Sequence, residues 1–244
     1  VRNIAFLAIP ASLLMIVLRA HIVRVLLGAG AFSWNDTRLV AAAVGLFAVS
    51  IVAQCIVLLM VRAFYAIGET RVPLRINLWS FVVTLITTAL LLVFYRESSL
   101  FRDFMQSLMR IDGVEGSSVI MLALGFSMGQ IFNAIVLWWR FARRMHGARE
   151  LHRATARAIS HMLAAGIISG AATYGTLQLI GVGVDQSKVI GVFIQAMIAG
   201  IIGLATYGIV LKALGNQDIE LFISTLRSKF WKQRPVVVPQ QQDL

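Results

Sequence analysis

Charged residues, cysteine and proline are all scarce in this sequence. Only 14% of its 244 residues are charged, whereas an ordinary soluble domain carries about 25%. The one cysteine, Cys55, cannot form an intrachain disulfide, and it lies in an apolar stretch without the partners that a metal site needs. The low charge excludes an ordinary soluble globular domain, and Cys55 is interpreted as a small packing residue.

Long apolar stretches take the place of the missing charges, and 59% of the residues are hydrophobic. A helix needs about 20 predominantly apolar residues to cross a bilayer. Barrel strands are about half that length and alternate apolar with polar residues, which these stretches do not. The sequence therefore predicts an all-α polytopic membrane protein with six transmembrane helices. The six stretches are Ile4–Leu18, Leu39–Val61, Leu78–Tyr95, Ser118–Trp139, Ile159–Ile180 and Val189–Leu211.

Basic residues are divided unevenly between the two sides of the predicted bundle. With six spans, 15 of the 22 Lys and Arg residues fall on the side that holds both ends of the chain. Cytoplasmic loops are enriched in Lys and Arg, so both ends are predicted to be cytoplasmic. The net charge of +11 also fits nucleic-acid binding, but basic residues beside apolar spans set topology and attract anionic lipids. No nucleic-acid partner is therefore expected.

The connections between the spans give the remaining organisation. Residues 1–211 are predicted to form a six-span transmembrane unit, with a cytoplasmic basic linker at 140–157. Residues 212–244 are predicted to form a cytoplasmic tail, first an amphipathic helix and then a disordered end. Leu100–Met109 has apolar residues at helical spacing, which fits a membrane-surface helix or one packed on other loops. Asp36 is the expected N-cap of the second span, and His21–Leu27 is either an extension of the first span or a short interfacial helix.

Chemistry-bearing side chains are few inside the spans. No Asp or Glu occurs there, and no His, Cys or carboxylate cluster has metal-ligand spacing. The sequence therefore predicts no enzyme, no metal site and no cofactor, and it favours binding, packing and movement. Polar residues such as Gln54, Thr84, Asn133 and Gln195 tie helices together or face a polar cavity. The glycine pair Gly125/Gly129 predicts close helix packing, with a groove or hinge as the alternative.

Two stretches carry a more specific pattern. The first is Gly30-Ala31-Phe32-Ser33-x-x-Asp36-Thr37, and the second runs from Arg62 to Pro73. In their order and spacing they resemble the MviN/MurJ family of lipid II flippases, within the multidrug/oligosaccharidyl-lipid/polysaccharide exporter superfamily. The resemblance of motifs covers about residues 10–73, and the other spans agree in number and spacing. The residues that match in the two motifs are Gly30, Ala31, Phe32, Asp36, Thr37, Arg62, Phe64, Tyr65, Gly68, Glu69, Thr70, Arg71 and Pro73.

The resemblance implies a fourteen-span flippase with two lobes around a central cavity, of which this chain resembles spans nine to fourteen. Such a protein moves lipid II, the lipid-linked peptidoglycan precursor, across the bacterial inner membrane by alternating access. Its partners would be lipid II, membrane lipids and the missing N-terminal lobe of the same chain. The family's cavity arginines match no residue here. Because the chain starts with Val, it is expected to be a piece of a longer protein. The alternatives to the flippase function are a polysaccharide-repeat or drug exporter of the same superfamily and a non-transporting membrane scaffold.

Two local structures can be expected from these residues. Gly68 permits the positive φ of a tight turn and Pro73 suits the start of the next helix, so the second motif is interpreted as a rigid helical hairpin. The resemblance also places a groove for the lipid tail between the fifth and sixth spans. Small residues there are compatible with it, and the candidates are Gly166, Gly170, Gly200 and Gly203.

Overall fold

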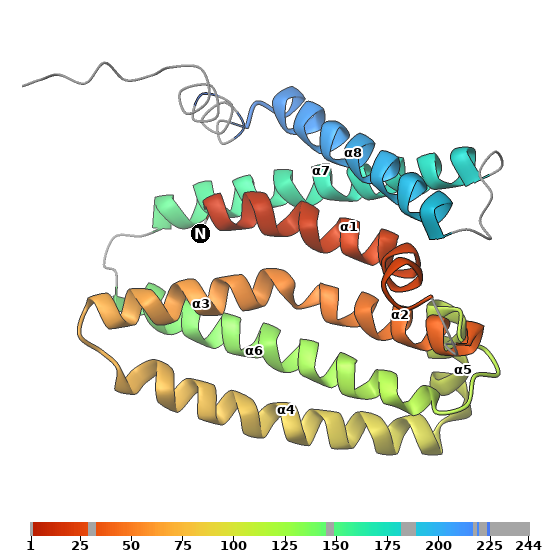
Figure 1. The fold of residues 1–244 in the computed structure, drawn as a ribbon. Coiled ribbons are helices and arrows are strands. Elements are labelled where there is room, and N and C mark those ends of the chain that lie inside the picture. The colour runs from red at the N-terminus through yellow and green to blue at the C-terminus, as the bar shows by residue number, and fades with distance from the viewer. Residues whose placement is uncertain are drawn as a thin grey trace, which may run out of the picture.

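In the part of the chain that it describes, the computed structural model consists of helices joined by turns, and it holds no strand there. It describes residues 2–28, 33–144, 149–181 and 189–216, with Ile219 and Ser224, but not the side chains of residues 149–156. The helices are drawn in Figure 1. They are α1 (Arg2–Leu27), α2 (Trp34–Val49), α3 (Ile51–Ala66), α4 (Arg71–Glu97), α5 (Ser99–Met109), the short 3₁₀ turn η1 (Ser117–Val119), α6 (Ile120–Arg144), α7 (Arg149–Gly181) and α8 (Val189–Ala213).

The predicted all-α polytopic fold is confirmed. Within the described residues, α1, α4, α6, α7 and α8 are each long and apolar enough to cross a bilayer. α2 and α3 pass the same test together as one span bent by 41°. α1 continues without a break to Leu27, so the stretch after Leu18 is an extension of the first span. The predicted basic linker is largely helical as well, since α6 reaches Arg144 and α7 begins at Arg149.

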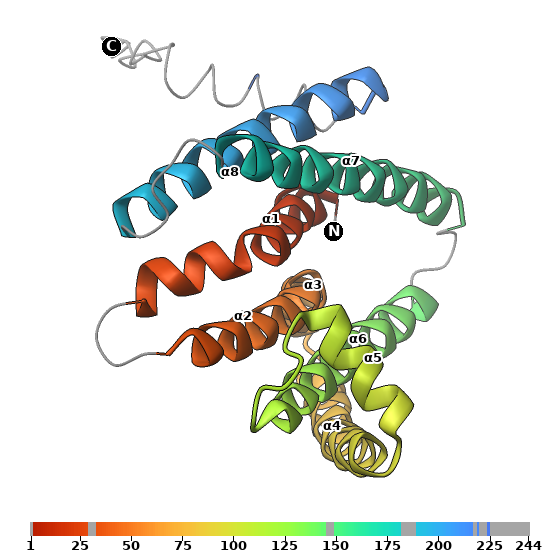
Figure 2. The ribbon, with the colours of Figure 1, turned by 90° about the vertical axis from the view of Figure 1, so that its right-hand side faces the viewer.

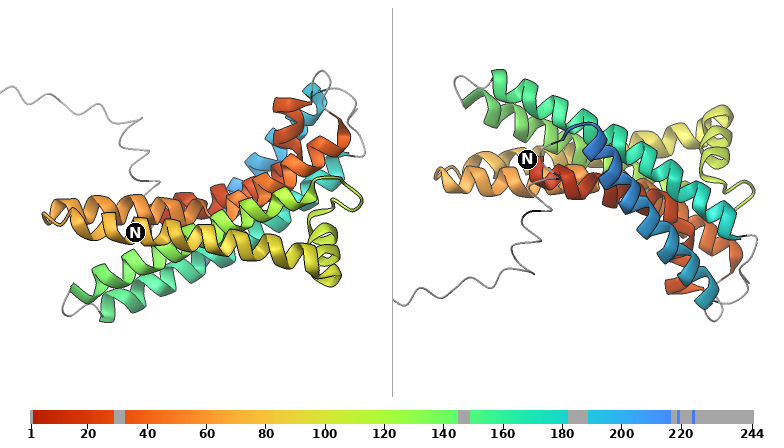
Figure 3. Two further views of the ribbon diagram at one scale, coloured as in Figure 1. Left: turned by 90° about the horizontal axis from the view of Figure 1, so that it is seen from below. Right: turned by 90° about the horizontal axis from the view of Figure 1, so that it is seen from above.

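α1 lies between two groups of helices. Figure 1 shows α7 and α8 on one side of it and α2, α3, α6 and α4 on the other. α1 packs against α2, α3, α7 and α8, whereas α7 and α8 make their main contacts with each other and with α1. The helices cross one another instead of running parallel (Figure 3). The α3–α4 connection marks one end of the bundle, here named the hairpin end, and the opposite end is named the α5 end.

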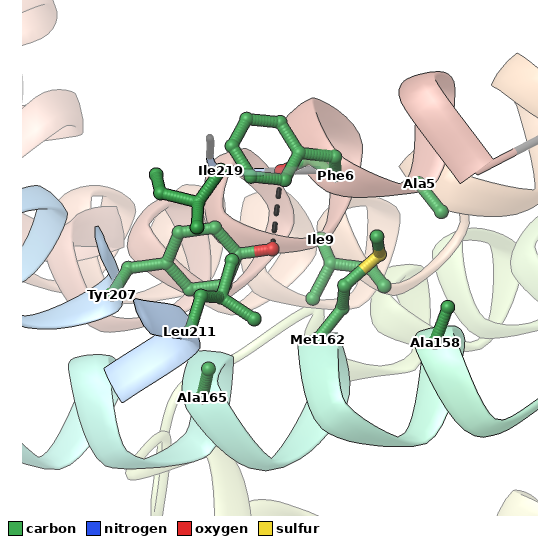
Figure 4. Packing of buried hydrophobic residues seen from close by; sticks show 9 residues of the cluster. All are labelled: Ala5, Phe6, Ile9, Ala158, Met162, Ala165, Tyr207, Leu211 and Ile219. Carbon is green, nitrogen blue, oxygen red and sulfur yellow. Dashed lines mark hydrogen bonds between the residues drawn. The ribbon is translucent and has the colours of Figure 1, made fainter. Parts of the chain in front are cut away.

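Proline and tyrosine together shape the contact between α1 and α8. Pro10 has no N–H, so it cannot donate to the carbonyl of Phe6 four residues earlier. The hydroxyl of Tyr207 donates to that same carbonyl across the helix interface, at 3.1 Å. Figure 4 shows this bond inside a buried apolar cluster that joins three helices. The cluster consists of Ala5, Phe6, Ile9, Ala158, Met162, Ala165, Tyr207, Leu211 and Ile219.

Glycines of α6 admit the threonines of α4 at close range. A Cβ added at Gly125 would lie 2.9 Å from the Cα of Thr88, and one added at Gly129 would lie 2.8 Å from the Cβ of Thr84. In lipid, helices associate through such close van der Waals packing because burial of apolar surface gives little driving force. Asn133 of α6 adds a polar contact, since its Nδ2 donates to Oδ1 of Asn77 on α4 at 3.0 Å. The close packing predicted for this glycine pair is confirmed.

A serine marks the bend between α2 and α3. The Ser50 hydroxyl donates to the Phe47 carbonyl at 2.7 Å, and the Ser50 N–H donates to the same carbonyl. Gln54 Nε2 donates to the Ser50 hydroxyl oxygen at 2.8 Å. A serine that hydrogen-bonds back to its own helix competes with the backbone ladder and bends the helix. The second predicted span is thus a broken helix, although neither proline nor glycine stands at the break.

α5 lies across the α5 end of the bundle, as Figure 2 shows. Its inner side packs on the core through Met105, and Gln106 Nε2 donates to the hydroxyl oxygens of Tyr95 and Ser117. Its outer side carries a row of exposed apolar side chains four residues apart. The row consists of Leu100, Phe104 and Leu108, with exposed fractions of 84%, 61% and 54%. Of the two expectations for this segment, α5 is thus a helix packed on neighbouring parts of the chain. Its outer row also suits the membrane surface.

Candidate functional site

The second sequence motif forms the turn between α3 and α4. Gly68 adopts a φ of +78°, the left-handed conformation expected for it. The N–H of Gly68 donates to the Tyr65 carbonyl at 3.0 Å, and the N–H of Glu69 donates to the Phe64 carbonyl at 2.9 Å. Pro73 lies in the first turn of α4, where backbone N–H groups have no acceptor within the helix. The motif therefore forms the tight helical hairpin that the sequence predicted.

Two motif side chains attach this hairpin to α6. Phe64 is fully buried, and its ring meets that of Phe141 edge-on, with centroids 5.5 Å apart. The Glu69 carboxylate forms an ion pair with the guanidinium of Arg144. These contacts give the motif a packing role at the hairpin end. The other motif side chains, which are exposed there, are Arg62, Tyr65, Thr70 and Arg71.

The first sequence motif begins α2. Its members Gly30, Ala31 and Phe32 lie outside the described residues. The N-cap of α2 is Ser33, so the expectation that Asp36 caps this helix is wrong. Asp36 instead completes a capping box, because its Oδ2 accepts from the Ser33 N–H at 3.0 Å while the Ser33 hydroxyl accepts from the Asp36 N–H. Thr37 is buried and donates to the Ser33 carbonyl at 3.1 Å.

The four glycines of the predicted lipid-tail groove have their nearest side-chain neighbours largely on α1. A Cβ at Gly166 would meet the Leu13 side chain, and one at Gly203 would lie 2.8 Å from Leu14. At Gly170 and Gly200 the nearest atom of α1 would be 3.6 Å away, an ordinary contact distance. Gly166 and Gly203 thus form the closest approaches in this three-helix contact, and the lipid-tail groove stays a prediction.

A cavity of about 550 Å³ lies at the α5 end, where α1, α2, α7 and α8 meet the last residues of α5. Among the described residues that line it, Arg and His are present but no Asp or Glu, and we name the space the basic cavity. Trp34, Tyr174, Gln178 and Gln195 add aromatic and polar groups to its wall. The basic residues that line it are Arg19, His21, Arg24, Arg38 and Arg110.

Neutral groups hold several of these cations in place. Arg19 Nη1 donates to the thioether sulfur of Met109 at 3.4 Å, and Arg38 Nε donates to the carbonyl of Arg110 at 2.7 Å. The guanidinium of Arg24 lies over the Trp34 ring, 5.5 Å from its centroid. The sequence reasoning missed the basic cavity because these arginines stand beside apolar stretches, where charge serves as a topology signal.

A known protein family matches this chain over the residues that hold its two motifs. The model of the protein family described as "Lipid II flippase MurJ" matches residues 1–183 of the 244. The chain belongs to the MurJ family of lipid II flippases. The MurJ family motifs identified from sequence lie within the matched residues, whereas α8 lies beyond them.

Two curated relatives carry the same name. The probable lipid II flippase MurJ of Rhizobium tropici is 24% identical over 232 residues, which cover 93% of this chain and 38% of that protein. The probable lipid II flippase MurJ of Rickettsia prowazekii (strain Madrid E) is 32% identical over 77 residues, 32% of this chain and 15% of that protein. The chain thus spans less than half the length of these MurJ family relatives.

Proposed function

We propose that this chain is the C-terminal lobe of a lipid II flippase, resembling spans nine to fourteen of the whole transporter. The observation that carries the proposal is the family match over residues 1–183, which includes the α3–α4 hairpin with its buried Phe64. The limited coverage of the Rhizobium tropici relative, 38% of its length, supports a further lobe of the same chain. Alternating access, with the two lobes moving about a central cavity, is part of this proposal.

The described spans offer surfaces for binding and sliding but few groups for chemistry. They hold no cluster of three or more His, Cys, Asp or Glu side chains that would bind a metal ion. Helices joined by glycine contacts and short interhelical hydrogen bonds suit rigid-body movement of a lobe. We propose transport without catalysis, in the bacterial inner membrane.

Transport is tested with the full-length protein in liposomes that contain fluorescent lipid II. We expect lipid II to cross to the outer leaflet, where a membrane-impermeant reagent quenches it, faster than in protein-free liposomes. A lipid-linked polysaccharide repeat offered in parallel should move more slowly. Movement of that repeat but not of lipid II would indicate another exporter of the superfamily, and movement of neither would indicate a scaffold.

The proposed orientation places the hairpin end in the cytoplasm, because most basic residues lie on that side. In a Cys55→Ala background, single cysteines at Ser99 and Glu115 should react with an impermeant maleimide added to intact spheroplasts. Cysteines at Thr70 and Lys212 should react only after the membrane is opened. All four side chains are exposed, so a difference in labelling reports the side of the membrane. The reverse pattern would contradict the orientation.

A further inference from the structure

The basic cavity gathers like charges close to the apolar spans. Arg19, His21 and Arg24 lie on α1, within a helix that is apolar enough to cross the bilayer. Cationic side chains in such a segment are costly to bury, and they mark ligand sites or ion pathways by default. No carboxylate lines the cavity among the described residues. An anion is the ligand that would balance this lining.

Two of the cavity arginines, Arg19 and Arg38, keep donors for such a ligand. A guanidinium has five N–H groups, and the described bonds of Arg19 and Arg38 go to a thioether and a backbone carbonyl, both neutral. The ion pairs given by the described residues, Arg102–Asp103 and Arg144–Glu69, involve neither of them. Guanidinium groups bind phosphate through paired N–H donors, which makes arginine the preferred residue for phosphate recognition.

Packing holds Arg19 in place before any ligand arrives. Its side chain passes so close to Gly45 of α2 that a Cβ there would lie 2.8 Å from Nη1 and 2.9 Å from Cδ. On the same wall, Nδ1 of His21 is buried, and it makes no hydrogen bond of normal geometry, although the Gln195 side chain interacts with the imidazole. A polar atom buried in this way costs free energy unless a ligand or a water satisfies it.

An apolar pocket of about 300 Å³ adjoins the basic cavity and shares His21 with it. It lies between α1 and α8, and its other lining residues are all apolar. A basic cavity beside an apolar pocket matches a molecule with an anionic head and a hydrocarbon chain. The apolar lining consists of Ile22, Val25, Leu26, Phe193, Ala196 and Met197.

We propose that the basic cavity binds the phosphate group of a phosphate-bearing lipid, whose hydrocarbon chain starts in the apolar pocket between α1 and α8. Its volume of about 550 Å³ falls within the range of roughly 300–1,000 Å³ that is usual for small-molecule sites. Membrane phospholipids and polyprenyl phosphates share the required chemistry. The proposal does not depend on lipid II transport, since a resident phospholipid would bind here whether or not the protein is a flippase.

The test measures lipid binding to the delipidated full-length protein by native mass spectrometry. The probes are phosphatidylglycerol, a polyprenyl phosphate, the phosphate-free lipid diacylglycerol and inorganic phosphate. Arg19→Gln and Arg38→Gln should each weaken binding of the phosphate-bearing lipid about tenfold, the size of one lost charged hydrogen bond. Arg96→Gln is the matched control, because Arg96 is exposed near the same end and lies outside the cavity lining, and it should change nothing.

A second variant separates a lipid from free phosphate. Ala196→Phe fills the apolar pocket, so it should weaken lipid binding while leaving any binding of inorganic phosphate unchanged. If Arg19→Gln lowers the yield of folded protein, Arg19→Lys takes its place in the test. Lysine keeps the charge but lacks the paired N–H donors of the guanidinium, so this variant should still bind the lipid more weakly than the unmodified protein does.

The probes decide between the sources. Retention of phosphatidylglycerol alone would identify a phospholipid site, and retention of the polyprenyl phosphate alone would identify a carrier-lipid site; both support the proposal. Equal retention of diacylglycerol, or binding of inorganic phosphate without any lipid, would overturn it. Unchanged lipid binding in both arginine variants and in Ala196→Phe would overturn it as well.

Discussion

Replacing Gly125 with leucine should leave little folded protein in the membrane. A Cβ at this position would collide with Thr88 Oγ1 and would lie 2.9 Å from the Cα of Thr88. A side chain can rotate away from such a contact, but a backbone atom moves only if α4 moves as a whole. Overpacking costs about 1–3 kcal/mol where the core can adjust, and this site has little room to adjust. α4 would therefore separate from α6.

Abundance of the full-length protein in membranes, followed by size-exclusion chromatography in mild detergent, measures this effect. Gly175→Leu is the matched control, because the same substitution on α7 introduces a Cβ with no atom within 4 Å. The control should keep near-normal abundance and elute as a single species. Equal abundance of the two variants would show that α4 and α6 do not need this close approach.

Replacing Gly203 with leucine should have the second largest effect, because it inserts a side chain where α8 meets both α7 and α1. A Cβ there would collide with Thr173 Oγ1 and lie 2.8 Å from Leu14 Cδ2. It would also crowd the bond in which the Ser169 hydroxyl donates to the Gly203 carbonyl, at 2.7 Å. We expect α8 to lose its place against α1 and α7 and the protein to lose most of its thermal stability.

An alanine pair on the same helix gives the sharper comparison. Gly200→Ala should be neutral or slightly stabilising, since the new methyl lies 3.6 Å from Leu18 and alanine favours a helix over glycine by about 1 kcal/mol. Gly203→Ala should lower the melting temperature in detergent. If both are tolerated but lipid II flipping falls, the glycines would form the predicted lipid-tail groove and not only a packing surface.

The spans could be predicted from the sequence because lipid imposes a strong and simple requirement. Twenty apolar residues in a row must close their own backbone hydrogen bonds, so run length alone indicates a helix. Run length does not locate the ends of a helix, because a helix can continue beyond its apolar stretch. The apolar stretch of the first span stops at Leu18, where Arg19 follows, yet long side chains at a helix end can reach polar surroundings while the helix continues to Leu27.

Local polar chemistry was harder to predict because it depends on partners. Ser33 and Asp36 both suit an N-cap, and only the backbone geometry assigns the cap to Ser33. The bend at Ser50 has no proline or glycine to announce it, and serine inside a helix often causes no break. The basic cavity is harder still to predict from the sequence, since it joins side chains from five helices that no spacing rule connects.

The contact between Phe6 and Tyr207 constrains the order in which this helix bundle assembles. The two residues are 201 positions apart in the chain, so α1 enters the membrane long before α8 has been synthesised. During that interval the face of α1 that will meet Tyr207 and Leu211 has neither of them as a neighbour. The bundle is therefore completed only when its last helix, α8, packs against its first, and a ribosome that stops before α8 leaves α1 without that partner.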